Sequence, residues 1–94
     1  MKLVWSRLAV QDRQLIFEHI ALENPLAAVA SDREISSQLS ALKDFPEMGR
    51  PGKVKGTREL VIQRTPYLAA YLLRGDEILI LRVLHGAQMW PERF

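Results

Sequence analysis

The chain has 94 residues, 48% of them hydrophobic and 26% charged, a composition typical of one small globular domain and not of a disordered or fibrous protein. It contains no cysteine, which excludes disulfides, thiolate metal ligands and a cysteine nucleophile. The net charge is +2, and no apolar run approaches the roughly 20 residues that cross a bilayer, so we expect a single cytoplasmic domain over residues 1–94 with neither signal peptide nor membrane contact.

The first half of the chain predicts a strand followed by a helix. Residues 2–5 are apolar and β-prone, and Ser6 is suited to accept an unpaired amide at the start of a helix over residues 7–23. The helical spacing is carried by apolar residues that recur every seven positions or lie beside them: Leu8, Leu15, Leu22, Ile16 and Ile20. The charged residues Asp12, Arg13 and Glu18 fall on other faces of this helix.

A second helix is predicted from the sequence that ends the first. Asn24 can cap it and Pro25 can occupy its first position, and Phe45-Pro46 stops it after Asp44. Its apolar face consists of Ala28, Ile35, Leu39 and Leu42.

The second half of the chain predicts a loop and then three strands. Residues 47–56 contain three glycines and a proline, which favours a loop. Strands are expected over residues 58–63, 67–73 and 77–84, and the short turns at Thr65-Pro66 and at residues 74–76 favour an antiparallel meander. In the last strand, strict alternation would place Leu79, Leu81 and Val83 on one face and Ile78, Ile80, Arg82 and Leu84 on the other. The element order β-α-α-β-β-β therefore predicts an α+β fold, a helical hairpin packed on a small antiparallel sheet.

Basic residues are concentrated in one short segment. Residues 1–49 carry five basic and seven acidic side chains, a local charge of −2. Residues 50–64 carry only Glu59 against five cations, a local charge of +4 from Arg50, Lys53, Lys55, Arg58 and Arg64. Such a patch attracts phosphate groups or an acidic protein surface, although an ordinary solvated loop is the alternative interpretation.

Several strings spread over the chain resemble the RelE/ParE superfamily of bacterial toxins. They are Asn24-Pro25 with Ala27-Ala28, then residues 45–50, residues 56–60 and residues 80–85. The resemblance implies the toxin of a type II toxin–antitoxin system, neutralised by a cognate antitoxin protein, with operator DNA bound only through that antitoxin. It implies one of two targets: ParE-like members inhibit DNA gyrase, and RelE-like members cut messenger RNA on the ribosome. A non-toxic relative that only binds its partner is a third possibility.

The resemblance to the RelE-like nucleases is incomplete at the residues that would do the chemistry. Such members carry lysine and arginine where this chain has Glu59, Val61 and Leu68, and a tyrosine near the C-terminus where it has residues 88–90. These departures favour the gyrase target, with the ribosome-dependent endoribonuclease as the alternative.

If the chain is a nuclease, His85 and Arg82 are its candidate catalytic residues. Cleavage through a 2′-hydroxyl needs a group that takes a proton near neutral pH and cations that hold the phosphate. His85 could be the base, and Arg82, with Arg58 or Lys55, could hold the phosphate. The alternatives are that His85 ends a strand and hydrogen-bonds locally, and that Arg82 is a partly buried arginine paired with an acidic side chain.

A second set of residues is predicted to contact the target, whichever target it is: Arg50, Lys53, Lys55, Arg58, Gln88 and Trp90. Trp90 could instead pack in the core, and Trp5, Tyr67 and Tyr71 are expected to do so. The spacing of histidine and acidic residues predicts no metal site, and we expect no cofactor.

Overall fold

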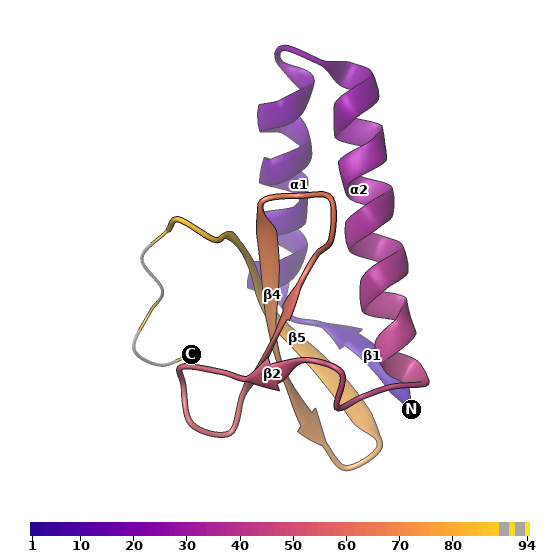
Figure 1. Ribbon diagram of the computed structural model, residues 1–94, viewed down its shortest axis with the longest axis vertical. Coiled ribbons are helices and arrows are strands. Elements are labelled where there is room, and N and C mark those ends of the chain that lie inside the picture. The colour runs from indigo at the N-terminus through magenta and orange to yellow at the C-terminus, as the bar shows by residue number, and fades with distance from the viewer. Residues whose placement is uncertain (89–90, 92–93) are drawn as a thin grey trace.

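The computed structural model describes residues 1–88, Pro91 and Phe94, and in this part of the chain two helices pack on a five-stranded sheet (Figure 1). The elements are β1 (Lys2–Trp5), α1 (Arg7–Ala21), α2 (Pro25–Ser40), a short 3₁₀ turn η1 (Ala41–Lys43), β2 (Arg50–Pro51), β3 (Arg58–Val61), β4 (Tyr67–Arg74) and β5 (Glu77–His85). The predicted α+β fold is confirmed. None of the described helices is both long and apolar enough to cross a membrane.

The strands lie in the order β1-β5-β4-β3-β2. The predicted meander of β3, β4 and β5 is confirmed as antiparallel. The prediction of a wholly antiparallel sheet was wrong, because β1 lies parallel to β5, with Lys2 opposite Glu77 and Trp5 opposite Ile80. The two helices and the meander together make the long connection that a parallel neighbour requires.

Strand β2 lies inside the segment that was predicted to be only a loop. Arg50 pairs with Glu59, and Pro51 lies opposite Arg58. A proline is tolerated here because β2 is the edge strand, where its missing N–H need not serve a further neighbour. The strand is therefore too short and too rich in strand-breaking residues to be recognised from its own sequence.

Both helices begin where their capping residues predict. The Ser6 hydroxyl accepts a hydrogen bond from the Ala9 amide at 3.0 Å, and the Asn24 side chain accepts one from the Ala27 amide at 3.1 Å. Each bond satisfies an amide that the helix itself leaves unpaired.

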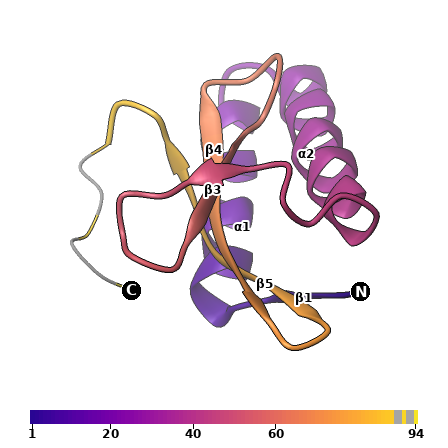
Figure 2. The same ribbon diagram turned by 60° about the horizontal axis from the view of Figure 1, so that its bottom comes forward.

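The helices cover one face of the sheet, because α1 lies behind β4 in both views (Figure 1, Figure 2). The apolar face predicted for the second helix is confirmed as buried, since all four of its residues are fully buried, although Leu42 lies in η1 because α2 ends at Ser40. The helix predicted over residues 7–23 is confirmed as α1. The leucines of its heptad, Leu8, Leu15 and Leu22, are exposed, while Ile16 and Ile20 pack against the core. The buried positions of α1 are Ala9 and Asp12, so a carboxylate occupies the face that packs on the sheet.

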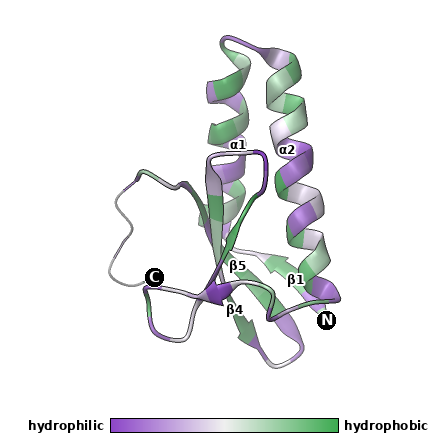
Figure 3. Ribbon diagram, in the orientation of Figure 1, coloured by the Kyte–Doolittle hydropathy of each residue, from purple (hydrophilic) through white to green (hydrophobic). Residues whose placement is uncertain are grey.

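The core lies between the helices and the sheet, where apolar residues of β5 and its neighbours gather (Figure 3). Tyr67 and Tyr71 are both part of it, and Trp5 packs against it, as predicted. The strict alternation predicted for β5 was wrong after Ile80. The register shifts there, so that Tyr71 lies opposite Ile80 and Ala70 opposite Arg82, which leaves Leu81 as an extra residue. This bulge turns Val83 into the core beside Ile80.

Candidate catalytic and target-binding sites

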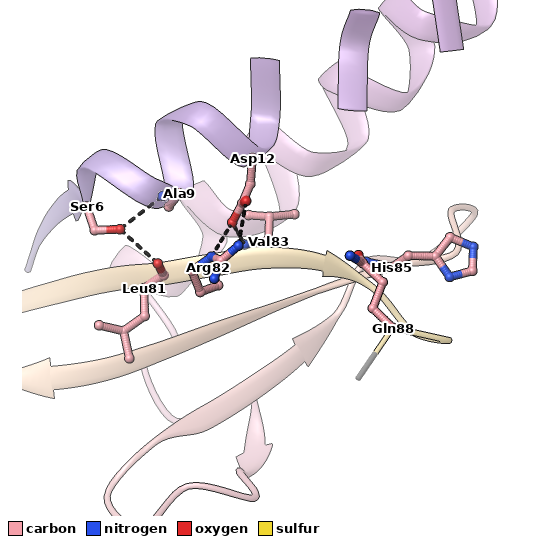
Figure 4. Close-up of polar contacts among 8 residues, drawn as sticks. All are labelled: Ser6, Ala9, Asp12, Leu81, Arg82, Val83, His85 and Gln88. Atoms are coloured by element: carbon pink, nitrogen blue, oxygen red, sulfur yellow. Dashed lines mark hydrogen bonds and ion pairs between the residues drawn. The ribbon is translucent and has the colours of Figure 1, made fainter. Parts of the chain in front are cut away.

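The end of β5 is held against α1 by a buried ion pair. The Arg82 guanidinium donates two hydrogen bonds to the Asp12 carboxylate, Nε to Oδ2 at 2.7 Å and Nη2 to Oδ1 at 2.9 Å (Figure 4). The side chains are 25% and 10% exposed, respectively. These bonds to Asp12 raise the pKa of Arg82 above its ordinary value. The alternative that Arg82 is a partly buried arginine paired with an acidic side chain is therefore confirmed.

Asp12 also closes the edge of β5 that β1 is too short to cover. Its Oδ2 accepts the main-chain amide of Val83 at 3.0 Å, and the Ser6 hydroxyl donates to the carbonyl of Leu81 at 2.8 Å (Figure 4). Side chains at the start of α1 thus take the hydrogen bonds that a longer β1 would make. The Asp12 carboxylate thus accepts three hydrogen bonds, two of them from the Arg82 cation. These bonds offset the free-energy cost of burying its charge, which accounts for its place on the packed face of α1.

His85 lies at the exposed end of β5 and bonds locally. Its amide donates to Gln88 Oε1 at 2.6 Å, and its ring Nδ1 accepts the amide of Ala87 at 3.0 Å. The ring also packs in a T-shaped arrangement with the Tyr67 ring, with centroids 5.7 Å apart. The alternative interpretation of His85, as a strand end with local hydrogen bonds, is confirmed. In this arrangement the neutral ring carries its proton on Nε2.

A shallow groove of about 460 Å³ lies between α1 and the end of β5. Arg82, His85 and Gln88 line it, together with His19, an exposed residue of α1. The structure therefore brings the two candidate catalytic residues to one groove, but it commits the Arg82 cation to Asp12. A catalytic role for either residue stays a prediction.

The basic segment after η1 is anchored by a buried acid that sequence reasoning did not single out. Glu59 is 5% exposed, and its carboxylate accepts Arg50 Nη2 at 3.3 Å and the main-chain amide of Lys53 at 2.9 Å. One carboxylate therefore fixes the course of residues 50–53 and neutralises one of their cations.

A second anchor holds the residues just before β2. The fully buried Tyr71 hydroxyl accepts the amide of Gly49 at 2.9 Å and donates to the carbonyl of Pro46 at 2.8 Å. Burial raises the pKa of Tyr71. A side chain at position 49 would have no room, because a Cβ there would lie 2.6 Å from the Tyr71 hydroxyl oxygen. Arg58 completes the anchor by donating to the carbonyls of Gly49 and Glu47 at 2.7 and 3.2 Å.

The predicted target-binding residues thus divide into two kinds. Arg50 and Arg58 hold the segment in place, whereas the Lys53 and Lys55 ammonium groups are exposed and make no ion pair among the described residues. Gln88 lies in the other groove, beside His85. Trp90 lies outside the described residues. A role in target binding remains a prediction for all of them.

The anchoring residues differ in how visible they were in the sequence. Asp12 stands in helical phase with Ala9 and Ile16, and that spacing could have indicated that it faces the core. Glu59 carried no such signal. Tyr71 was expected in the core, but its sequence neighbours did not indicate the partners of its hydroxyl. The described residues contain no cluster of three or more histidine, aspartate or glutamate side chains arranged to hold a metal ion.

Comparisons with known proteins point to one family. Residues 3–90 match the family model described as the ParE toxin of the type II toxin–antitoxin system parDE. A protein of Sinorhizobium fredii named "Putative toxin Y4kP" is 36% identical over 88 residues, which cover 94% of this chain and 91% of that protein. A solved structure titled "Chromosomal ParDE TA system from P. aeruginosa" superposes with a TM-score of 0.84 at 33% identity, over 90% of this chain and 95% of that one.

Proposed function

Because the chain belongs to the ParE toxin family of type II toxin–antitoxin systems, we propose that it arrests bacterial growth by inhibiting DNA gyrase in the cytoplasm, and that a cognate antitoxin neutralises it. The pairing of Arg82 with Asp12 carries this proposal. It removes the strongest candidate phosphate ligand beside His85, so a binding mode of inhibition is favoured over RNA cleavage.

Among the cations predicted to contact a target, those that remain unpaired in the described residues belong to the basic segment. Lys53 and Lys55 stand exposed on a segment whose main chain is fixed by Glu59 and Tyr71. A fixed main chain lowers the ordering cost when these side chains bind. They would contact the DNA that gyrase holds or an acidic surface of gyrase itself, and added salt should weaken either contact.

A supercoiling assay tests the proposal directly. Purified protein is incubated with gyrase, ATP and relaxed plasmid, and we expect loss of supercoiling or accumulation of cleaved DNA at increasing concentrations of the chain. Normal supercoiling without cleaved DNA, with a large excess of folded protein, would reject gyrase as the target.

The groove at the end of β5 supports the ribosome-dependent endoribonuclease as a second candidate. It places His85 and His19 in one groove with Arg82, and imidazoles can act as general acids or bases in RNA cleavage. This alternative predicts messenger RNA cleavage on translating ribosomes that is lost in His85→Ala. Expression without any antitoxin tests both candidates together, because unimpaired growth would favour a non-toxic binding relative.

A further inference from the structure

At the edge of the sheet beside β2, the main-chain groups of one residue, Val61, have no strand to pair with in the described part of the chain. Strand β2 covers only Arg58 and Glu59 of β3. Farther along, the amide of Ile62 donates to the carbonyl of Tyr67 at 3.0 Å, so Ile62 directs its main-chain groups toward β4. Main-chain groups alternate along a strand, so those of Val61 and Gln63 point away from β4, toward the edge.

The neighbouring position on this edge is occupied by a side chain. The Gln38 side chain, from α2, donates to the carbonyl of Gln63 at 3.0 Å and accepts the amide of Gln63 at 2.7 Å. This is the pair of hydrogen bonds that a residue of an added strand would make. The main chain of Val61 lies between this amide and β2, and no such pair covers it in the described part of the chain.

A groove of about 560 Å³ follows this edge. Ala41, Met48 and Val61 give it apolar walls, and Arg50 and Arg64 line it as well. The arginine side chains are 61% and 70% exposed although each contacts one glutamate. Glu59 also lines the groove and pairs with Arg50, as Glu34 pairs with Arg64. Because these ion pairs are exposed on their arginine side, they are weak enough for an acidic partner to compete for the guanidinium groups. The groove therefore combines free main-chain groups, apolar walls and two exposed guanidinium groups, which suit an extended segment with acidic side chains.

We propose that the antitoxin lays an extended, acidic segment along this edge of β3, where its main chain pairs with Val61 and, after displacing the Gln38 amide, with Gln63. The inference rests on the proposed function, because the partner is the neutralising antitoxin. The Gln38 bonds are exposed to water, so their loss is offset by new bonds to the partner and to solvent. In the free toxin, the Gln38 side chain satisfies the main-chain groups of Gln63 and so shields this edge from unspecific strand pairing.

Isothermal titration calorimetry of the full chain with the antitoxin encoded beside its gene tests this surface. Val61→Pro removes the amide that points into the groove, and an edge position tolerates proline. We expect Val61→Pro, and separately Arg50→Glu with Arg64→Glu, to weaken binding at least tenfold. Arg74→Glu is the matched control, because Arg74 is 62% exposed and contacts one glutamate as Arg50 does. Its affinity should change less than threefold.

Hydrogen exchange on the wild-type complex gives a second measurement that does not depend on a variant folding. The amides of Val61 and Gln63 should exchange at least tenfold more slowly in the complex. Unchanged exchange there, or wild-type affinity in Val61→Pro, would overturn this surface and leave neutralisation standing. No binding to the wild-type chain would overturn neutralisation and this inference together. Self-association of the chain that Val61→Pro abolishes would assign the edge to a second copy and also overturn it.

Discussion

The end of β5 and the basic segment around β2 both carry cations that the sequence offers as target ligands, yet the fold uses these cations in opposite ways. At the end of β5, the guanidinium of Arg82 is bound to a buried carboxylate and holds α1 on the sheet. Around β2, buried Glu59 and Tyr71 hold the main chain and leave Lys53 and Lys55 in solvent. The contrast teaches that a cation is available to a target only where other groups stabilise the segment that carries it.

Removing Asp12 should have the largest effect on stability. In Asp12→Ala, Arg82 loses its counter-ion and the Val83 amide loses its acceptor, so we expect the free energy of unfolding to fall by about 2–4 kcal/mol. Urea denaturation followed by circular dichroism measures this. Arg82→Ala and the double variant complete a double-mutant cycle, and additive effects would contradict a coupled pair.

Removing the Tyr71 hydroxyl should have an intermediate effect, confined to the other region. Tyr71→Phe leaves the Gly49 amide and the Pro46 carbonyl without their partner, which should cost about 1–2 kcal/mol. Hydrogen exchange should then rise at Gly49 while the Val83 amide keeps its protection. Equal increases at both amides would show that the two regions are not stabilised separately.

The stability of the folded chain as a function of pH tests a third contact, the ion pair between Arg13 of α1 and Asp32 of α2. Arg13 donates two hydrogen bonds to Asp32. This hydrogen bonding lowers the pKa of Asp32 below its ordinary value. The folded state therefore gains stability above the unfolded pKa, about 3.9, and loses it as pH falls through the lower folded value. In Asp32→Asn this acid loss should be smaller by about 0.5–1 kcal/mol, since the pair is partly exposed. Parallel pH profiles of the two proteins would contradict a stabilising role for the pair.

Reversing the charges of Lys53 and Lys55 should have the smallest effect on stability and the largest effect on gyrase inhibition. Lys53→Glu with Lys55→Glu should change the free energy of unfolding by less than about 0.5 kcal/mol. Gyrase inhibition should fall at least tenfold, and more at low salt than at high salt. Lys43→Glu, another exposed lysine, is the control for the charge change. Full inhibition by the double variant would remove the basic segment from the target interface.

Local signals in the sequence were sufficient for most of the fold. Ser6 and Asn24-Pro25 set the helix starts because caps act within a few residues, and the meander followed from its short turns. Two features depended on distant contacts and could not be predicted in the same way. The parallel pairing of β1 with β5 and the two-residue β2 exist only once the sheet has assembled.

The sequence predicted which residues could form the candidate sites. It did not predict which of their side chains form ion pairs within the fold and which remain available to a target. Arg82 was offered both as a phosphate ligand and as half of an ion pair, and the acidic partner that the structure shows lies 70 positions away along the chain. No periodicity joins residues at that separation. Glu59 was interpreted as the lone acid of a basic segment and as a departure from the RelE-like pattern, whereas its burial comes from the segment folding back over it.

The neighbour relation between the first and the last strand has a consequence for biosynthesis. Strand β1 is synthesised well before β5, its neighbour in the described sheet, and Asp12 is likewise synthesised before Arg82. A chain whose translation stops before residue 77 therefore lacks both partners and cannot complete its sheet. The sheet of the toxin is therefore completed only after β5 has been synthesised.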